Sequence, residues 1–238
     1  MINLYRNMMA KVGVVFALAW AFAIGTASTA DAAFILRLDD PTTLGIDVTV
    51  ADQGAGDINP TVGVVMFSGS VGAFAVNVST GVSKPIVGSA GIPRIDLNSI
   101  DVTTGSGGSL QIWLTGTGFT ALGPAMMSIG GVTAGNVTYA AWADESNVEF
   151  AMGSQVGVLG PFFSGYFSGG TGTAGLLVAS LTPYSLTQQV LIVHPTAGAT
   201  SFNATLAVPE PATLVLLGLG LFGVVVFARR RARQLVFE

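Results

Sequence analysis

Three oxygen-bearing side chains, Asp52, Asp57 and Asn59, stand close together in a stretch that also holds Gly54 and Gly56. Calcium binds several oxygen ligands that flexible loops of this kind supply. The stretch lacks the full D-x-[DN]-x-[DN]-G pattern of an EF-hand and its closing glutamate. Tight turns use Asp, Asn and Gly for their backbone tolerance. A plain turn is therefore the favoured interpretation, with a calcium site as the alternative and no other cofactor expected.

Aromatic side chains form a second group with a chemistry of its own. Four of them lie in one glycine- and serine-rich stretch: Phe162, Phe163, Tyr166 and Phe167. With Trp113 and Trp142, such rings offer flat surfaces on which the apolar C–H faces of sugars stack. Aromatic side chains bury about 150 to 250 Å² each, so a hydrophobic core also needs them. The core is the favoured interpretation, and carbohydrate binding is the alternative.

Acid–base chemistry has few candidates in this chain. Glycosidases place two carboxylates across a cleft, and Asp144, Glu145 and Glu149 form the densest local group. Adjacent residues on a strand point to opposite faces, so Asp144 and Glu145 do not both reach one substrate there. His194 is the only histidine, and no nucleophilic partner for it is identifiable. We therefore predict that the protein is not an enzyme, with a glycoside hydrolase as the remote alternative.

The charge balance excludes several kinds of partner. From Phe34 to Ala207 the chain has 10 carboxylates against 3 cationic side chains, and so a net charge of about −7. Nucleic acid binding needs Lys and Arg to neutralise phosphates, so nucleic acid is not an expected partner. The same sign disfavours adhesion to anionic lipid. The absence of cysteine removes thiolate nucleophiles, cysteine-bound zinc and disulfides together.

The elements that must position these residues are short strands. Runs such as 46–50, 74–78 and 110–114 alternate apolar and polar residues with period two. Glycine supplies 27 of the 174 residues from Phe34 to Ala207 and gathers between the runs. This share is about twice the usual one. We predict strands near residues 34–39, 45–51, 62–68, 72–79, 95–103, 109–116, 125–130, 136–143, 147–152, 176–182, 186–194 and 200–207.

Strand after strand with turn signals at these intervals predicts an all-β fold. We expect one extracytoplasmic domain over residues 33–207, an antiparallel β-sandwich or jelly-roll-like domain. No internal repeat of fixed period is visible, so a parallel β-helix is the alternative. The least organised stretch is 153–175, which we interpret as a long hairpin with core aromatics or as an exposed loop.

The first 32 residues have the three parts of a secretory signal peptide. Arg6 and Lys11 give a positive start, and residues 12–25 form an apolar segment. Ala30 and Ala32 form an A-x-A cleavage site, after which Ala33 begins the mature chain. We expect export through the general secretion machinery and cleavage by signal peptidase. A retained N-terminal anchor is the alternative.

Residues 208–238 form a second addressing segment. Val208, Pro209, Glu210 and Pro211 are predicted to form an extended, exposed joint, because each proline fixes its own φ and restricts the residue before it. The apolar run 212–228 follows, with 17 uncharged residues. As a helix it is about 26 Å long, which matches a bilayer core. The cations of the tail 229–238 are Arg229, Arg230, Arg231 and Arg233. They are expected to stay in the cytoplasm, so the preceding domain lies outside it.

This arrangement resembles the PEP-CTERM sorting signal of Gram-negative bacteria. The resemblance rests on the triplet 209–211, the Leu- and Gly-rich apolar run and the terminal arginines. The tail is also known under a name taken from ice-binding proteins, but the Thr-x-Thr ladder that ice recognition needs does not repeat here. The resemblance implies that an exosortase, a membrane-embedded thiol enzyme, reads the signal. An unprocessed C-terminal anchor is the alternative.

The two terminal segments, 1–32 and 208–238, and the β domain together predict an exported protein. Its tail is expected to anchor it in the inner membrane until an exosortase acts. The resemblance implies export alongside extracellular polysaccharide, and so a destination at the cell surface or in the extracellular matrix. We predict a structural or adhesive role in exopolysaccharide or biofilm. A carbohydrate-binding module is the first alternative.

Overall fold

A computed structural model describes residues 32–121, 123–171, 177–178 and 183–209, together with Gly220 and Phe222. The predicted signal peptide up to Asp31 lies outside the described residues. So do Glu210, Pro211, most of the apolar run and the arginines of the tail. Within the described part of the chain, no helix is both long and apolar enough to span a membrane.

The described residues form 14 strands. Their bounds are β1 (Phe34–Asp39), β2 (Val48–Ala51), β3 (Val64–Val71), β4 (Phe74–Val82), β5 (Arg94–Thr104), β6 (Gly108–Phe119), β7 (Gly123–Pro124), β8 (Met126–Thr133), β9 (Asn136–Asp144), β10 (Ser154–Phe162), β11 (Gly165–Gly170), β12 (Leu177–Val178), β13 (Tyr184–His194) and β14 (Gly198–Ala207).

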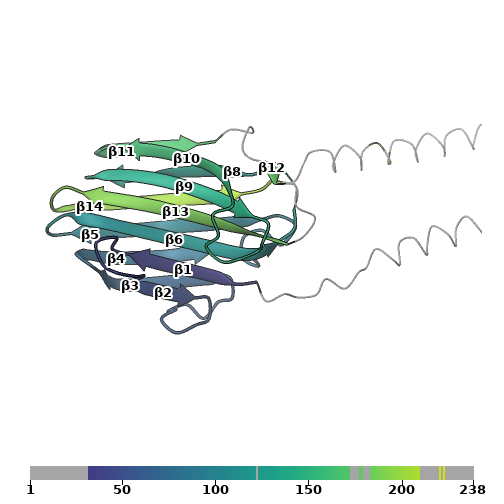
Figure 1. Ribbon diagram of the computed structural model, residues 1–238, viewed down its shortest axis with the longest axis horizontal. Coiled ribbons are helices and arrows are strands. Elements are labelled where there is room, and N and C mark those ends of the chain that lie inside the picture. The colour runs from purple at the N-terminus through teal and green to yellow at the C-terminus, as the bar shows by residue number, and fades with distance from the viewer. Residues whose placement is uncertain are drawn as a thin grey trace, which may run out of the picture. The chain divides into compact units, whose positions relative to one another are not determined.

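Twelve of these strands build two stacked six-stranded sheets (Figure 1). Sheet A has the order β10-β9-β13-β6-β1-β2, and sheet B has the order β11-β8-β14-β5-β4-β3. Every pairing is antiparallel. The predicted all-β antiparallel sandwich is therefore confirmed. The chain crosses between the sheets repeatedly, so facing pairs such as β5 and β6 or β13 and β14 are neighbours in sequence.

The core between the sheets follows from the period-two pattern of the strands. In β1, Phe34, Leu36 and Leu38 are buried while the residues between them are partly exposed. In β6, Leu110 and Ile112 face inward in the same way. Full burial of a side chain of this size stabilises the fold by about 1.5–3 kcal/mol relative to exposure. The alternation therefore fixes which face of each sheet looks outward.

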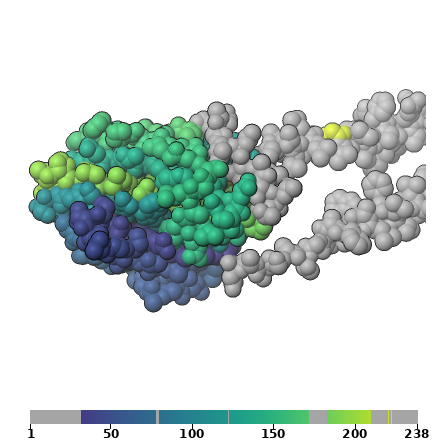
Figure 2. Space-filling view, viewed as in Figure 1, coloured from purple at the N-terminus to yellow at the C-terminus, as the bar shows by residue number. Residues whose placement is uncertain are grey.

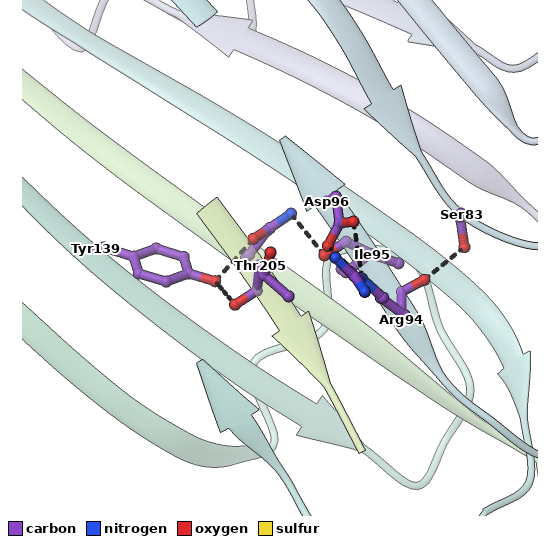
Figure 3. Close-up of polar contacts among 7 residues, drawn as sticks. Ser83, Arg94, Ile95, Asp96, Tyr139 and Thr205 are labelled. Atoms are coloured by element: carbon purple, nitrogen blue, oxygen red, sulfur yellow. Dashed lines mark hydrogen bonds and ion pairs between the residues drawn. The ribbon is translucent and has the colours of Figure 1, made fainter. Parts of the chain in front are cut away.

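A polar network crosses the core and joins the two sheets (Figure 3). The Tyr139 hydroxyl on β9 donates to Gln188 Oε1 on β13 at 2.8 Å and lies 3.0 Å from the carbonyl oxygen of Thr205 on β14. Gln188 Nε2 donates to the carbonyl oxygen of Ile95 on β5 at 3.5 Å. Burial, and then the charge of Asp96, raise the pKa of Tyr139 well above its usual value. The phenol therefore stays protonated and acts as a donor.

The structure differs from the sequence prediction between β9 and β11. The predicted strand 147–152 is a loop, in which Asn147 and Phe150 have φ of 58° and 57°. Left-handed backbone of this kind does not continue a strand. The stretch 153–175, predicted as a hairpin or a loop, instead holds β10 and β11, which lie in different sheets. The chain therefore turns from one sheet to the other there.

Candidate functional site

The outward face of sheet A carries a row of large side chains. Arg37 on β1 is the register partner of Trp113 on β6, and Trp113 is the partner of Gln189 on β13. All three are partly exposed, because the residues on either side of them in each strand point into the core. The row therefore crosses the middle of the sheet at one level.

Two tryptophans stack within this face. Trp113 on β6 and Trp142 on β9 have ring centroids 5.9 Å apart and planes inclined by 20°. Strand β13 runs between their strands. Gln111 Oε1 accepts hydrogen bonds from Trp113 Nε1 and from Gln189 Nε2, each at 3.1 Å. These bonds fix the polar edge of the Trp113 indole, while one of its faces packs against Trp142.

The loop 145–153 folds back over one end of the same face. Phe150 N donates to Thr115 Oγ1 at 3.2 Å, and Gly118 N donates to Asn147 Oδ1 at 2.7 Å. Both bonds reach from the loop to β6. The Phe150 ring lies under the guanidinium of Arg37, with the central carbon 3.7 Å from the ring centroid. This cation–π contact holds the guanidinium on the face of the sheet.

A pocket of about 190 Å³ opens between these groups. Its lining consists of Arg37, Ile46, Gln111, Trp113 and Phe150. In Figure 2 the purple segment that contains β1 and the loop 41–47 and the green segment near residue 150 lie on the same face. The pocket is smaller than the roughly 300–1,000 Å³ of drug-sized sites. Its size suits one ring of a larger ligand.

Hydrogen bonds between acidic side chains and the backbone build the loop that supplies Ile46. Asp40 N donates to Asp47 Oδ2 at 2.7 Å, and Thr43 Oγ1 donates to Asp47 Oδ1 at 3.1 Å. The Asp40 carboxylate accepts from Thr42 N at 3.0 Å. The loop is thereby a defined wall of the pocket, with the Ile46 side chain 48% exposed.

The electrostatics of the site suit polar recognition better than acid–base chemistry. Arg37 Nε is buried without a hydrogen-bond partner, and Arg37 forms no ion pair among the described residues. Asp39 Oδ1 is also buried without a partner. Burial, followed by the charges of Asp47 and Asp40, raises the pKa of Asp39. The pocket lining offers donors and aromatic surface but no carboxylate or histidine.

The aromatic cluster predicted from the sequence divides into an inner and an outer pair. Phe162 and Phe167 stack on each other, with centroids 5.0 Å apart, and pack against the core. Phe163 and Tyr166 are 67% and 95% exposed near the turn between β10 and β11. Only this outer pair presents its rings to solvent. Sugar stacking by the cluster stays a prediction that concerns Phe163 and Tyr166.

The residues of the calcium hypothesis bind backbone amides. Asp57 Oδ1 accepts from Asn59 N and Met66 N, each at 3.0 Å, and Asp57 Oδ2 accepts from Gln53 N at 3.0 Å. Asp52 Oδ2 accepts from Gly63 N at 2.7 Å, and burial raises the pKa of Asp52. Within the described residues, no group of three or more His, Cys, Asp or Glu side chains is placed to hold a metal. These bonds are those of a turn, and calcium binding stays a prediction.

The other titratable candidates lie apart from the pocket. Asp144 Oδ1 accepts from Ser146 N at 2.9 Å, and Glu145 and Glu149 are exposed in the loop. His194 is buried, with its Nε2 at 2.8 Å from Thr200 Oγ1. Burial lowers the pKa of His194. None of these four side chains lines the pocket, although Asp39 on β1 is the register partner of the lining residue Gln111.

At each end of the domain, the residues next to the predicted signal peptide and sorting signal are part of the fold. Ala33 N donates to Thr117 Oγ1 at 2.9 Å directly before β1, while Ala32 is exposed. At the other end, Pro209 is exposed, but the prediction of an exposed joint is wrong for Val208, because its side chain is fully buried in the core. Ala30, Glu210, Pro211 and the membrane-stop arginines lie outside the described residues. The cleavage and sorting assignments themselves stay predictions.

Sequence reasoning identified the tryptophans but missed Arg37, Gln111 and Phe150. A signal for the first two is present in the strands. Arg37 occupies an outward position of β1, and Gln111 and Trp113 occupy outward positions of β6, two residues apart. Phe150 has no such signal, because its loop reaches Thr115 over a sequence separation of 35 residues.

Comparison with known proteins identifies the tail. The family model of the PEP-CTERM protein-sorting motif matches residues 207–231. No curated protein matches the chain in sequence. Among solved structures, TmCBM61 in complex with beta-1,4-galactotriose matches at a TM-score of 0.37 and 9% identity, over 67% of this chain and 94% of that chain. The enzymatically active domain of bacteriophage CBA120 tailspike protein 4 matches at 0.26 and 12%, over 54% and 18%. Likenesses this distant carry no argument for a function.

Proposed function

We propose that this PEP-CTERM sorting domain-containing protein is an exported matrix protein whose sandwich binds extracellular polysaccharide on the outward face of sheet A. The sorting motif at residues 207–231 implies recognition by an exosortase and membrane anchoring before processing. Signal peptidase removes the first 32 residues in this proposal, and the arginine tail stays in the cytoplasm. The processed domain then reaches the cell surface or the matrix, with a structural or adhesive role.

The observation that carries the binding role is the stacked tryptophan pair beside the pocket. A sugar ring presents apolar C–H groups on one face and hydroxyls around its edge. The indole faces of Trp113 and Trp142 suit the first, and Arg37 and Gln111 suit the second. Arg37 lines the pocket, and its guanidinium is a multiple N–H donor for hydroxyl oxygens there.

The charge of the domain favours a neutral polysaccharide. The net charge of about −7 from Phe34 to Ala207 repels a polyanion over the whole surface. Asp39 and Asp47 lie on β1 and the loop that follows it, close enough for the charge of Asp47 to raise the pKa of Asp39. One arginine does not outweigh this negative surrounding. Neutral hexose units are therefore the proposed ligand.

The proposal is non-catalytic and needs no cofactor. Glycoside hydrolysis uses two carboxylates on either side of the scissile bond, and the lining of the pocket contains none. A purely structural protein, without a saturable ligand, is the competing candidate. A secreted hydrolase is the third.

Binding to the host's own exopolysaccharide tests the proposed ligand. The mature protein is mixed with immobilised polysaccharide, and neutral and acidic oligosaccharides are added as competitors. We expect saturable binding that neutral oligosaccharides reverse. Absence of saturable binding would leave the structural role, and the appearance of new reducing ends in the polysaccharide would indicate a hydrolase.

Mass spectrometry of the native protein tests the sorting pathway. Intact mass and C-terminal peptides are measured in the membrane and the culture medium of a host with its exosortase. We expect a chain that begins near Ala33 and ends near the triplet 209–211. Chains that still end at Glu238, and occur in the membrane alone, would contradict exosortase processing.

A further inference from the structure

The sorting motif begins inside the folded domain. The matched residues 207–231 start at Ala207, the last residue of β14. In the centre of sheet B, β14 pairs with β5 on one side and β8 on the other. Ala207 is the register partner of Arg94 on β5 and of Met126 on β8. The first matched residue is therefore held from both sides.

The next residue is held more tightly still. Val208 has no exposed surface and belongs to the hydrophobic core. Its N–H donates to the carbonyl oxygen of Pro93 at 3.0 Å. Pro209, one residue later, is exposed. The boundary between core and tail thus falls between two consecutive residues of the motif, with no spacer.

We propose that this boundary sets the upstream limit of processing, so that the exosortase cuts on the C-terminal side of Pro209. The proposal rests on the sorting role given above. In the step itself, one peptide C–N bond breaks. The carbonyl carbon forms a new bond to the oxygen of water or to the nitrogen of an acceptor amine, which gives up a proton. The downstream nitrogen takes up a proton and leaves as a new N-terminal amine.

The physical reason is the cost of exposing Val208. An enzyme that cuts a peptide bond holds the residues on both sides of it in an accessible, extended form. The bonds on either side of Val208 reach that form only when the end of β14 leaves the sheet. Local opening of this kind populates a minor state. The lost burial of one valine alone makes that state roughly 10- to 100-fold rarer.

The consequence is a product that keeps its whole fold. The released domain retains β14 and Val208 and ends in a short stub that starts with Pro209. The residues that the enzyme holds in extended form on the upstream side of the cut bond then begin at Pro209. Recognition must therefore rest mainly on the residues that follow Pro209.

The C-terminal residue of the product tests the limit in cells. The full chain is produced in a host with its exosortase, and the mature protein is analysed by intact mass and C-terminal peptide mapping. A C-terminus at Pro209 or beyond is expected. A product that ends at Val208 or earlier would overturn the proposal.

Limited proteolysis tests the same limit without the exosortase. The full chain is purified in detergent and treated with a protease of broad specificity under native conditions. We expect the stable fragment to end at Pro209 or just beyond it. A stable fragment that ends before Val208 would also overturn the proposal. The protein could remain uncut in the host and still give a stable proteolytic fragment that ends at Pro209 or just beyond it. This result would contradict the sorting role but support the structural limit at Val208.

A matched pair of valine substitutions gives the control. Val208→Ala shortens the buried side chain, and cleavage at the end of β14 should become roughly 10-fold faster. Val132→Ala removes the same atoms from a side chain that is 42% exposed on β8. That variant should be cut at the wild-type rate. Equal rates for the two variants would show that burial of Val208 does not set the boundary.

Discussion

The outward faces of the two sheets differ far more than their inward faces. Both sheets have six antiparallel strands and contribute aliphatic residues to one core. Most outward positions of β5, β8 and β14 in sheet B carry small side chains, among them Thr103, Ser128, Ala199, Ser201 and Asn203, while Val132 and Tyr166 are larger exposed side chains on β8 and β11. Outward positions of sheet A carry Arg37, Gln111, Trp113 and Trp142. The large side chains of sheet A line the pocket or stack beside it, which is why the proposed binding face is that of sheet A.

This difference predicts the largest effect for Trp113→Ala. The substitution removes one wall of the pocket and one ring of the stacked pair. We expect the affinity for neutral polysaccharide to fall about 10- to 100-fold, the loss typical of a central binding residue. Calorimetric titration measures it, with Ser201→Ala on sheet B as the control. Equal losses in the two variants would remove the distinction between the faces.

The interior network provides a variant that should change stability and leave both faces alone. Tyr139→Phe removes the donor to Gln188 Oε1 and to the carbonyl oxygen of Thr205, both inside the sandwich. We expect the free energy of unfolding to fall by about 1–3 kcal/mol. Denaturant titration measures the change, and polysaccharide affinity should stay at the wild-type value. If the affinity fell together with the free energy of unfolding, binding would depend on the stability of the whole sandwich.

Phe150→Gly sharpens the comparison within sheet A. Glycine accepts the left-handed backbone found at this position, with φ of 57°, so the loop is expected to keep its path. The variant loses the ring under Arg37, a contact of about 0.5–2 kcal/mol. We expect a threefold to tenfold weaker affinity by the same titration. Phe163→Ala, at the exposed turn before β11, should have no effect. A larger loss from Phe163→Ala would move the site to the aromatic cluster.

The smallest expected effect is that of low pH on the stability of the fold. It should leave the tryptophan face unchanged. Burial lowers the pKa of His194 in the folded state, so the unfolded chain binds the proton more readily. The contribution of His194 to stability is complete above about pH 6.5 and is lost as the pH falls toward the lowered pKa. We expect the melting temperature to fall between pH 7.5 and 5.5. His194→Gln should flatten that slope, because His194 is the only histidine. If the dependence of melting temperature on pH persisted in His194→Gln, other titratable groups would be its cause.

Local patterns predicted most of the fold but little of the site. Alternating runs such as 110–114 lie within strands, because period two is a property of the strand itself. The loop 145–153 escaped prediction, since its shape depends on bonds to Thr115 and Gly118 on β6. The pairing of Trp113 with Trp142 depends on β13 running between their strands, which no local pattern encodes. The pairing register of strands that are far apart in the sequence therefore determines which side chains meet at the site.

The central position of β14 determines how the anchored domain responds to force. A pull on the membrane tail acts through Pro209 along β14, whose ladders reach β5 from Gly198 to Ala207 and β8 from Thr200 to Ala207. Force along the strand loads the hydrogen bonds of both ladders in shear, all at once. Force on an edge strand across its ladder would open the bonds one after another. If the proposed ligand held the tryptophan face while the tail was still anchored, tension would thus load both ladders of β14 together.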